Sequence, residues 1–466
     1  MPSDALLDVA IVGGGLAGLI HLHYARRAGL RAHLFERASG VGGLWRELPA
    51  WQDIQIRPLD WTVGDLPVAG PMQPQILANI EQWVARFGLA DGISLGCPVR
   101  QARHAGGVWV LESPLGEVRA RHLVAATGAH NVPVIPAVQR QGAQGGEPPA
   151  SARGRDLRAS AQVGELPASV QGHELPASAQ VRELHSSALR EPAELAGRDV
   201  VVVGGGASAF DLLELCLEHG ARRIVWVYRS LRWFTPTRKP KAVAGSVRPL
   251  ARQQAEGVPI EQQTAAVDAD LRGRYRAFGI EALLPGRPVD LRHDQVFPGR
   301  AGMLAGLARI ERCPGTVRGV EGHEVLLSDG RRLAADLLLW GTGYRMDLGW
   351  LEDPRLAAID STAALAARCG CVMRSLDAPD LYLPGVLLDG FGATSWNYAI
   401  IARTVMSHVR GQARLDLEPT AHRLNHLDVV AHLAARDPAS FGGADARAWC
   451  REAGLGTPDD RPYALP

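Results

Sequence analysis

Residues 9–18 read VAIVGGGLAG and decide the fold of this chain. An apolar strand pattern runs directly into glycines spaced G-x-G-x-x-G, and an apolar helical pattern continues to Gly29. Gly13 allows the tight turn after the strand, Gly15 lets the backbone approach a pyrophosphate, and Gly18 lets the helix pack closely on the strand. The free N–H groups and the positive dipole end of the helix then face the phosphates. The stretch predicts a βαβ unit that binds a dinucleotide.

The residues that follow the glycine loop extend this unit. A second short strand pattern over 32–35 ends on Glu36, where an acid accepts both hydroxyls of an adenosine ribose. A lone G-x-G-x-x-G is weak evidence, but here it has the strand before it, the helix after it and the acid beyond. These three features together favour a dinucleotide site over an ordinary glycine-rich loop. The sequence Gly42-Gly43-Leu44-Trp45 comes next.

This combination resembles the FAD fingerprint of the flavin-containing monooxygenases and their Baeyer–Villiger relatives. That fingerprint joins G-x-G-x-x-G, a ribose-binding Glu and a following G-G-x-W. The resemblance implies that Gly13, Gly15, Gly18, Glu36, Gly43 and Trp45 hold FAD. Further expected cofactor-binding residues are Leu16, Ala17, Arg37, Leu44 and Val99.

Two further stretches resemble the crossover strands of flavoproteins with two dinucleotide sites. A buried strand pattern ends in Ala126-Thr127-Gly128, and a second ends in Gly341-Thr342-Gly343. Small residues at such points let the chain cross under the flavin pyrophosphate, so we include all six among the expected cofactor-binding residues. A pair of crossovers is the signature of a nicotinamide domain that is inserted within an FAD domain.

The second nucleotide site is predicted from residues 199–229. An apolar strand pattern leads into Gly204-Gly205-Gly206-Ala207-Ser208-Ala209, and a helix follows to Gly220. The next strand ends in Arg229, where an acid would select a free 2′-hydroxyl and an arginine accepts a 2′-phosphate. The sequence therefore predicts NADPH. The expected contacts are Gly204, Gly206, Ala207, Ser208 and Arg229, with added positive charge, or a solvated basic turn, at Arg232, Arg238 and Lys239.

The catalytic residues beside the flavin are harder to place. Related enzymes supply an Asn or His from the region that follows G-G-x-W, and no such residue can be aligned here. Gln55 and Arg57 are the nearest polar candidates, with Asp60 and Trp61 just beyond, and surface polar residues are an equal alternative. Residues 74–87 then read as a helix with Trp83 on its core face.

A nine-residue repeat lies between the two nucleotide sites. Its copies begin at 155, 164, 173 and, more loosely, 182, which is too short a period for a solenoid. We expect a mostly disordered surface insert at a domain boundary. The fourth copy aligns with the family motif F-x-G-x-x-x-H, of which only His185 is kept.

We therefore expect an α/β fold with two dinucleotide-binding (Rossmann-like) domains, the NADPH domain being inserted into a discontinuous FAD domain. The expected boundaries are 1–138 for the first part of the FAD domain, 139–190 for the insert, 191–335 for the NADPH domain, 336–415 for the second part of the FAD domain and 416–466 for a C-terminal helical tail.

The composition limits the partners and the cellular compartment that we expect for this protein. The 466 residues include 50 Lys and Arg against 49 Asp and Glu, so a net charge of +1 gives no support for nucleic acid or an anionic membrane as partner. No apolar run approaches about 18 residues, so no membrane span is expected. Six scattered cysteines and no expected leader indicate free thiols in the cytoplasm. Metal sites are not expected, and a homodimer is left open.

The resemblance implies an NADPH-dependent flavoprotein monooxygenase. In this family NADPH reduces FAD, and the reduced flavin traps O2 as a C4a-(hydro)peroxide that retained NADP⁺ shields. We expect oxygenation of a small molecule at nitrogen or sulfur. The alternative is Baeyer–Villiger oxygen insertion into a ketone, for example in a natural-product intermediate. A non-catalytic dinucleotide-binding regulator is a remote alternative, and a disulfide reductase would need the C-x-x-C that this sequence lacks.

Overall fold

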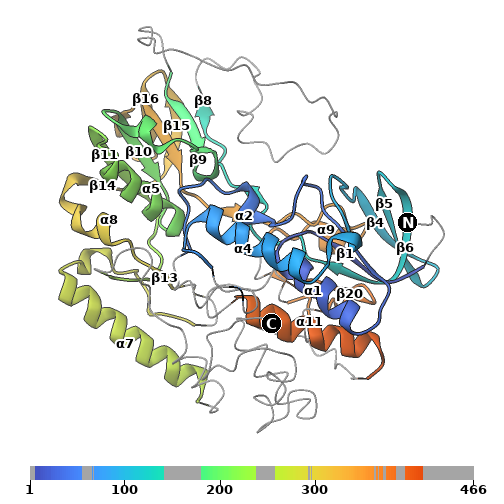
Figure 1. Ribbon diagram of the computed structural model, residues 1–466. Coiled ribbons are helices and arrows are strands. Elements are labelled where there is room, and N and C mark those ends of the chain that lie inside the picture. The colour runs from blue at the N-terminus through green and yellow to red at the C-terminus, as the bar shows by residue number, and fades with distance from the viewer. Residues whose placement is uncertain are drawn as a thin grey trace. The chain divides into compact units, whose positions relative to one another are not determined.

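The computed structural model describes residues 6–54, 66, 68–140, 180–237, 258–291, 294, 296–361, 364–365, 367–370, 374–384 and 394–412. The chain forms two compact units. The first joins Met1–Val132, Arg232–Ala301 and Tyr344–Pro466, and the second joins Pro133–Leu231 and Gly302–Gly343. Residues 232–301, which the sequence boundaries placed in the NADPH domain, thus group with the first unit. Figure 1 labels many of the elements of both units.

The first unit is built on a seven-stranded sheet in which β1 lies between β2 and β6. The order is β3-β2-β1-β6-β5-β4, and β20 pairs in parallel with β6. The β3, β2, β1 and β6 strands are parallel, and β5 and β4 are antiparallel additions. The strands are β1 Leu7–Val12, β2 Ala32–Phe35, β3 Ile93–Ser94, β4 Gln101–Ala105, β5 Val108–Ser113, β6 Gly116–Ala125 and β20 Leu381–Tyr382.

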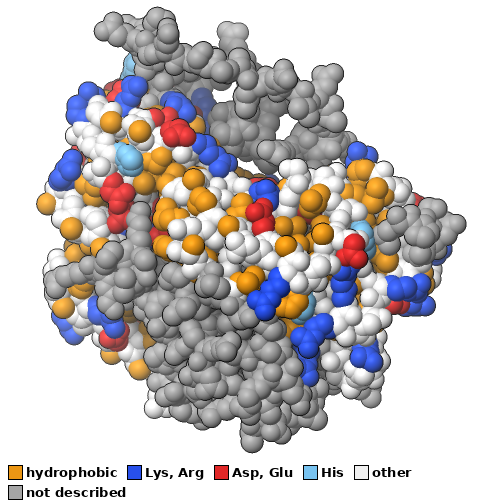
Figure 2. Space-filling view, in the orientation of Figure 1, with side chains coloured by type: hydrophobic (Ala, Val, Ile, Leu, Met, Phe, Trp, Pro, Cys, Tyr) orange, Lys and Arg blue, Asp and Glu red, His pale blue; other side chains and the backbone are white. Residues whose placement is uncertain are grey.

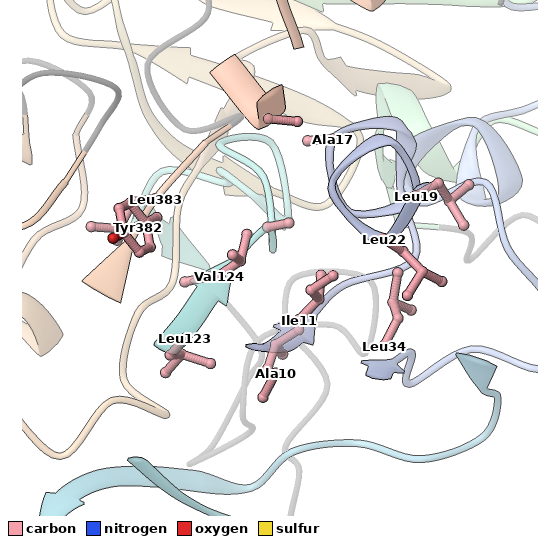
Figure 3. Close-up of a cluster of buried hydrophobic side chains, with 14 of the residues drawn as sticks. Ala10, Ile11, Ala17, Leu19, Leu22, Leu34, Leu123, Val124, Tyr382 and Leu383 are labelled. Carbon is pink, nitrogen blue, oxygen red and sulfur yellow. The ribbon is translucent and has the colours of Figure 1, made fainter. Parts of the chain in front are cut away.

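Two helices, α1 (Leu16–Arg27) and α11 (Thr394–Val409), pack against each other in this unit. Residues 16–25 of α1 are all buried, including His21 and His23, so the helix is covered on most sides. Figure 3 shows Leu22 of α1 pointing toward Ile11 of β1 and Leu34 of β2. The core beneath the first glycine loop is therefore closely packed.

The α4 helix (Gln73–Arg86) confirms the sequence prediction of a helix with one core face. Ile76, Ile80 and Val84 are buried, and Trp83 is 1% exposed. Trp83 is a core residue, and its ring is tilted by 50° against that of Phe87, with the ring centroids 5.3 Å apart. The remaining elements of this unit are α2 Leu44–Glu47, η1 Ala90–Gly92, β12 Phe234–Thr235, α7 Ile260–Phe278, η5 Glu281–Leu283, β13 Phe297–Pro298, β19 Tyr344–Arg345 and α9 Pro354–Ala357.

The second unit has a five-stranded parallel sheet in the order β14-β11-β10-β18-β9. A separate sheet, β17-β16-β15-β8, packs through Val320, Val325 and Leu327 against the buried residues of the parallel sheet. The elements are β8 Gln139–Arg140, β9 Arg182–His185, η2 Ser186–Ala188, η3 Pro192–Leu195, β10 Asp199–Val203, α5 Ala207–Glu218, β11 Arg223–Tyr228, η6 Leu307–Arg309, β14 Ile310–Pro314, β15 Val317–Glu321, β16 Glu324–Leu327, β17 Arg332–Ala334 and β18 Leu337–Trp340. The chain passes from one unit to the other within two elements, β7 Val132–Pro133 and α8 Ala301–Ala305.

The structure differs from the expected insert at its end. The fourth repeat copy forms β9, which pairs in parallel with β18 so that Leu184 lies opposite Leu339 and His185 opposite Trp340. Leu184 is 9% exposed and His185 is fully buried, so burial against the sheet gives this copy its conformation. Residues 141–179, which carry the other copies except for the last two residues of the third, and the tail after residue 412 lie outside the described residues.

On the face in Figure 2, the described acidic and basic side chains lie among hydrophobic ones. Within the described residues, no helix has the length and apolar character to span a membrane. The same residues contain no group of three or more His, Cys, Asp or Glu placed to bind a metal ion.

Candidate dinucleotide-binding sites

The first glycine loop is closed by the crossover after β6. Gly13 has φ +110°, and a Cβ there would lie 2.5 Å from the carbonyl oxygen of Ala126. A Cβ on Gly18 would lie 2.0 Å from the carbonyl oxygen of Gly13. Since Cβ atoms cannot approach so closely, only glycine allows β1, α1 and the crossover to meet at this point. These are the roles that the G-x-G-x-x-G spacing predicted for a tight turn and close packing.

The G-G-L-W turn lies directly on this loop. The N–H of Gly42 donates to the carbonyl of Gly14 over 2.9 Å, and a Cβ on Gly43 would lie 2.7 Å from Gly15 Cα. A Cβ on Gly15 itself would meet nothing nearer than Gly43 Cα at 3.6 Å. Gly15 is the N-cap of α1 and has no side chain to cover the first N–H groups of the helix. These groups can therefore bind a pyrophosphate.

Glu36 lies against the loop at the end of β2 and is 6% exposed. Its carboxylate accepts hydrogen bonds from the N–H groups of Gly14 and Ala38. A carboxylate has about four lone-pair sites, so two backbone donors leave acceptor sites for ribose hydroxyls. Arg37 is exposed and forms an ion pair with Glu47 at 3.1 Å, so no described contact brings it to the glycine loop.

An unsatisfied hydroxyl marks the crossover itself. The N–H of Ala126 donates to the carbonyl of Val12 over 2.8 Å, which places Thr127 next to the loop. The Oγ1 atom of Thr127 is buried without a hydrogen-bond partner, as is Oδ1 of Asn131. Buried polar atoms are nearly always paired, so both atoms are suited to a polar ligand, and Thr127 lies where such a ligand would meet the loop. The residues present therefore fit a dinucleotide such as FAD.

The other predicted FAD residues divide between the core and the surface. Leu16, Ala17 and Val99 are each 7% exposed and belong to the core. Leu44 is 37% exposed, and Trp45 is half-buried against the core.

The second unit repeats the geometry of the first loop. Gly204 has φ +140°, and a Cβ there would lie 2.2 Å from the carbonyl oxygen of Gly341. A Cβ on Gly341 would lie 2.7 Å from Cα of Ala209. Gly206 is the N-cap of α5, and Ala207 and Ser208 form its first turn. Both units therefore offer a helix N-terminus beside a closed glycine loop.

The turn after β11 lies against this second loop. A Cβ on Gly205 would lie 1.9 Å from the carbonyl oxygen of Ser230. The backbone of Arg229, the residue before Ser230, is therefore close to the glycine loop. Arg229 is exposed and follows the last residue of β11. Arg232 is exposed in the first unit, and Arg238 and Lys239 lie outside the described residues.

The second crossover is held in place by backbone and side-chain hydrogen bonds. The hydroxyl of Thr342 donates to the carbonyl of Val134, and the N–H of Val134 donates to the carbonyl of Gly343 over 2.9 Å. Nε2 of His185 also lies 3.0 Å from the Gly343 carbonyl oxygen. Thr342 and His185 thus fix the crossover strand, and Gly341 is the member of this triplet that lies at the glycine loop.

The catalytic candidates Gln55 and Arg57, and Asp60 and Trp61 beyond them, lie outside the described residues. The structure instead shows a buried ion pair at the edge of this segment. Nη2 and Nη1 of Arg300 lie 2.6 and 3.1 Å from the two carboxylate oxygens of Asp53, and the side chains are 4% and 1% exposed.

Sequence reasoning missed Asp53 and Arg300. Asp53 had a signal, because a carboxylate immediately before the apolar alternation of Ile54 and Ile56 is unusual in a short strand. Arg300 had none, since 247 residues separate it from its partner. Burial of two charges costs more than their attraction returns in many proteins, so a fully buried pair often marks a functional site.

The family model described as an NAD(P)-binding Rossmann-like domain matches residues 11–61. Phenazine N-monooxygenase PhzNO1 from Lysobacter antibioticus is 32% identical over 145 residues, 28% of this chain and 27% of that protein. Indole-3-pyruvate monooxygenase YUCCA1 from Oryza sativa subsp. japonica is 25% identical over 369 residues, 74% of this chain and 78% of that protein. The alignment to PhzNO1 thus spans about a quarter of its length.

Among solved structures, an oxidized steroid monooxygenase bound to NADP has a TM-score of 0.60 at 19% identity, covering 87% of this chain and 85% of that one. The resemblance to flavin monooxygenases is thereby confirmed, and so is the α/β fold with two Rossmann-like units.

Proposed function

We propose that this chain, which has the fold of the flavin monooxygenases, is an NADPH-dependent flavoprotein monooxygenase that binds FAD in its first unit and NADPH in its second. The observation that carries the proposal is the repeated loop geometry. Gly13 lies under the carbonyl of Ala126, and Gly204 lies under the carbonyl of Gly341. One chain therefore offers two helix N-termini for two pyrophosphates, and Arg229 stands where NADPH needs a cation.

FAD, when bound, would supply the redox and oxygen chemistry, which belongs to the cofactor. The protein would bind it with the N–H groups at the start of α1 and with Glu36 on the adenosine ribose. The buried side-chain oxygens of Thr127 and Asn131, which have no hydrogen-bond partner, would find one in FAD. In the second unit the start of α5, with Ala207 and Ser208, would hold the NADPH pyrophosphate.

We propose oxygenation of a small molecule at nitrogen or sulfur, with O2 as the second substrate. PhzNO1 is described by its name as an N-monooxygenase, which supports nitrogen as the atom that is oxidised. A substrate with a basic or soft heteroatom would react without activation by a charged side chain. This route therefore needs the protein only to position the substrate and to exclude water.

Baeyer–Villiger insertion into a ketone is the second candidate, and the Asp53–Arg300 pair favours it. A fixed, buried guanidinium stabilises negative charge on oxygen in a water-poor site. Insertion into a ketone, with chemistry that bound FAD would supply, would place negative charge on oxygen, whereas oxidation of an amine or sulfide would not. If Arg300 faces the reacting oxygen, this pair would shift the reaction toward ketones.

The proposal is tested by cofactor content and reduction. The purified chain should carry FAD that denaturation releases intact, and anaerobic NADPH should bleach the flavin absorbance. NADH at the same concentration should bleach it much more slowly. A chain that takes up no FAD, or one that NADPH fails to reduce, would contradict the proposed function.

A further inference from the structure

We infer that Gln73 is a positioning residue that fixes the Asp53–Arg300 pair relative to the FAD loop; this inference rests on the proposed function. Gln73 opens α4 and is 7% exposed. It touches both ends of the segment 45–52, which joins the G-G-L-W turn to Asp53.

One contact replaces a backbone hydrogen bond that the sequence forbids. The α2 helix has only four residues, and its first carbonyl, that of Leu44, accepts from Leu48 at 3.0 Å. The next carbonyl, that of Trp45, would accept from residue 49, but Pro49 has no N–H group. The Nε2 group of Gln73 donates to this carbonyl instead. A side chain thus satisfies the acceptor that proline leaves open.

The second contact holds the far end of the segment. The backbone N–H of Gln73 donates to the carbonyl of Gln52 over 2.7 Å. The pairing continues one residue further, because Asp53 forms a β-bridge with Met72 and the N–H of Ile54 donates to Pro71 over 2.9 Å. Asp53 therefore takes its position from the start of α4.

These contacts connect the FAD loop to the Asp53–Arg300 ion pair. Gly43 packs on Gly15 at one end, Trp45 follows it, and Gln73 ties Trp45 to the strand that carries Asp53. Asp53 in turn holds the guanidinium of Arg300. A shift of about 1 Å at a reacting centre can lower a rate by about 100-fold, so this tie bears on activity without itself touching substrate.

The test compares Gln73→Met, which keeps the side-chain length and removes the donor, with Gln75→Met. Gln75 lies in the same turn, and its Oε1 accepts from the N–H of Met72 at 3.0 Å, so the control also loses one hydrogen bond. In the ligand-free chain, amides of 45–54 should exchange about two- to tenfold faster in Gln73→Met than in wild type. Gln75→Met should leave most of the segment unchanged.

Gln73→Glu supplies a readout that packing alone would not give. Its carboxylate opposes the Trp45 carbonyl, and only the protonated acid donates to it. Exchange of 45–54 should therefore be fast at neutral pH and approach the wild-type rate as the acid protonates. In the FAD-loaded enzyme, Gln73→Met should give about tenfold less product per NADPH consumed, with KM for NADPH unchanged.

Equal exchange rates in wild type and Gln73→Met, or equal acceleration in both Met variants, would overturn the inference. So would normal product yield in Gln73→Met despite faster exchange. The exchange measurement needs no cofactor. A wild-type chain that binds no FAD would therefore contradict the proposed function, while exchange would still decide whether Gln73 holds the segment.

Discussion

Nε2 of His185 lies 3.0 Å from the carbonyl oxygen of Gly343, and Nδ1 accepts from the N–H of Ser187 at 3.2 Å. This arrangement requires the neutral ring with its proton on Nε2, which donates to Gly343. Burial lowers the pKa of His185 from 6.5 to about 4. A residue of the fourth repeat copy is thus an internal support of the second crossover strand.

The His185 contact predicts a pH dependence of stability. The pKa of the folded state is below that of the unfolded state, so the unfolded chain binds more protons between pH 6.5 and 4. Stability from this group is complete above pH 6.5 and falls as pH drops toward 4, by up to about 3 kcal/mol. His185→Gln keeps a donor and does not titrate, so its unfolding free energy should fall less steeply over this range. Equal slopes in wild type and variant would contradict the assignment.

Arg229 should decide the choice between NADPH and NADH. Loss of a charged contact to the 2′-phosphate costs about 1.5–3 kcal/mol. Arg229→Ala should therefore raise KM for NADPH by roughly ten- to a hundredfold and leave that for NADH nearly unchanged. Arg222→Ala is the matched control, because Arg222 is exposed just before β11 begins and pairs with Asp199. An equal rise in KM for NADPH and for NADH would point to a folding defect.

The first loop allows binding and folding to be separated by two alanine substitutions. Gly15→Ala adds a Cβ with nothing nearer than 3.6 Å, so the ligand-free chain should keep its unfolding temperature while FAD binding weakens at least about tenfold. Gly13→Ala adds a Cβ 2.5 Å from a carbonyl oxygen at φ +110°, and should lose about 1–3 kcal/mol or more without any cofactor. Calorimetry of the ligand-free chains and FAD titration check both. Equal destabilisation by the two variants would contradict this geometry.

The Asp53–Arg300 pair should show the cost of an unpaired buried charge. Arg300→Met removes the cation 2.6 Å from the buried Asp53 carboxylate and should destabilise the chain by about 3–5 kcal/mol. The double variant with Asp53→Leu should recover much of that loss in denaturant unfolding. If it does, product yields from ketones and from amines can be compared in a folded chain. No recovery in the double variant would contradict this expectation, because the two residues would then stabilise the chain by more than neutralising each other's charge.

Much of the fold could be predicted because local patterns encode it. The strand before Gly13, the helix after it and the repeat of both at Gly204 each follow from the spacing of glycines and apolar residues, and both loops have the predicted geometry. The β9 strand escaped prediction because its sequence is one copy of a repeat, and its pairing with β18 arises only in the tertiary structure. Residues 232–301 likewise carry no local signal for the unit that they join.

The candidate site was predicted less completely than the fold. Glycine loops are local in sequence, whereas Asp53 and Arg300 meet only through tertiary structure across 247 residues. Gln73 was missed for a similar reason, since its role follows from the missing N–H of Pro49 and from the position of α4. Whether Gln55 and Arg57 act on the substrate stays a prediction.

The central claim is that this chain uses NADPH and FAD to place one atom of O2 into a small molecule. The most direct measurement supplies the FAD-loaded chain with NADPH, isotopically labelled O2 and a mixture of amines, sulfides and ketones, followed by mass spectrometry of the products. The account predicts one labelled oxygen atom in a product, formed with consumption of one NADPH. Label found only in hydrogen peroxide and water, with every substrate class unchanged, would contradict it.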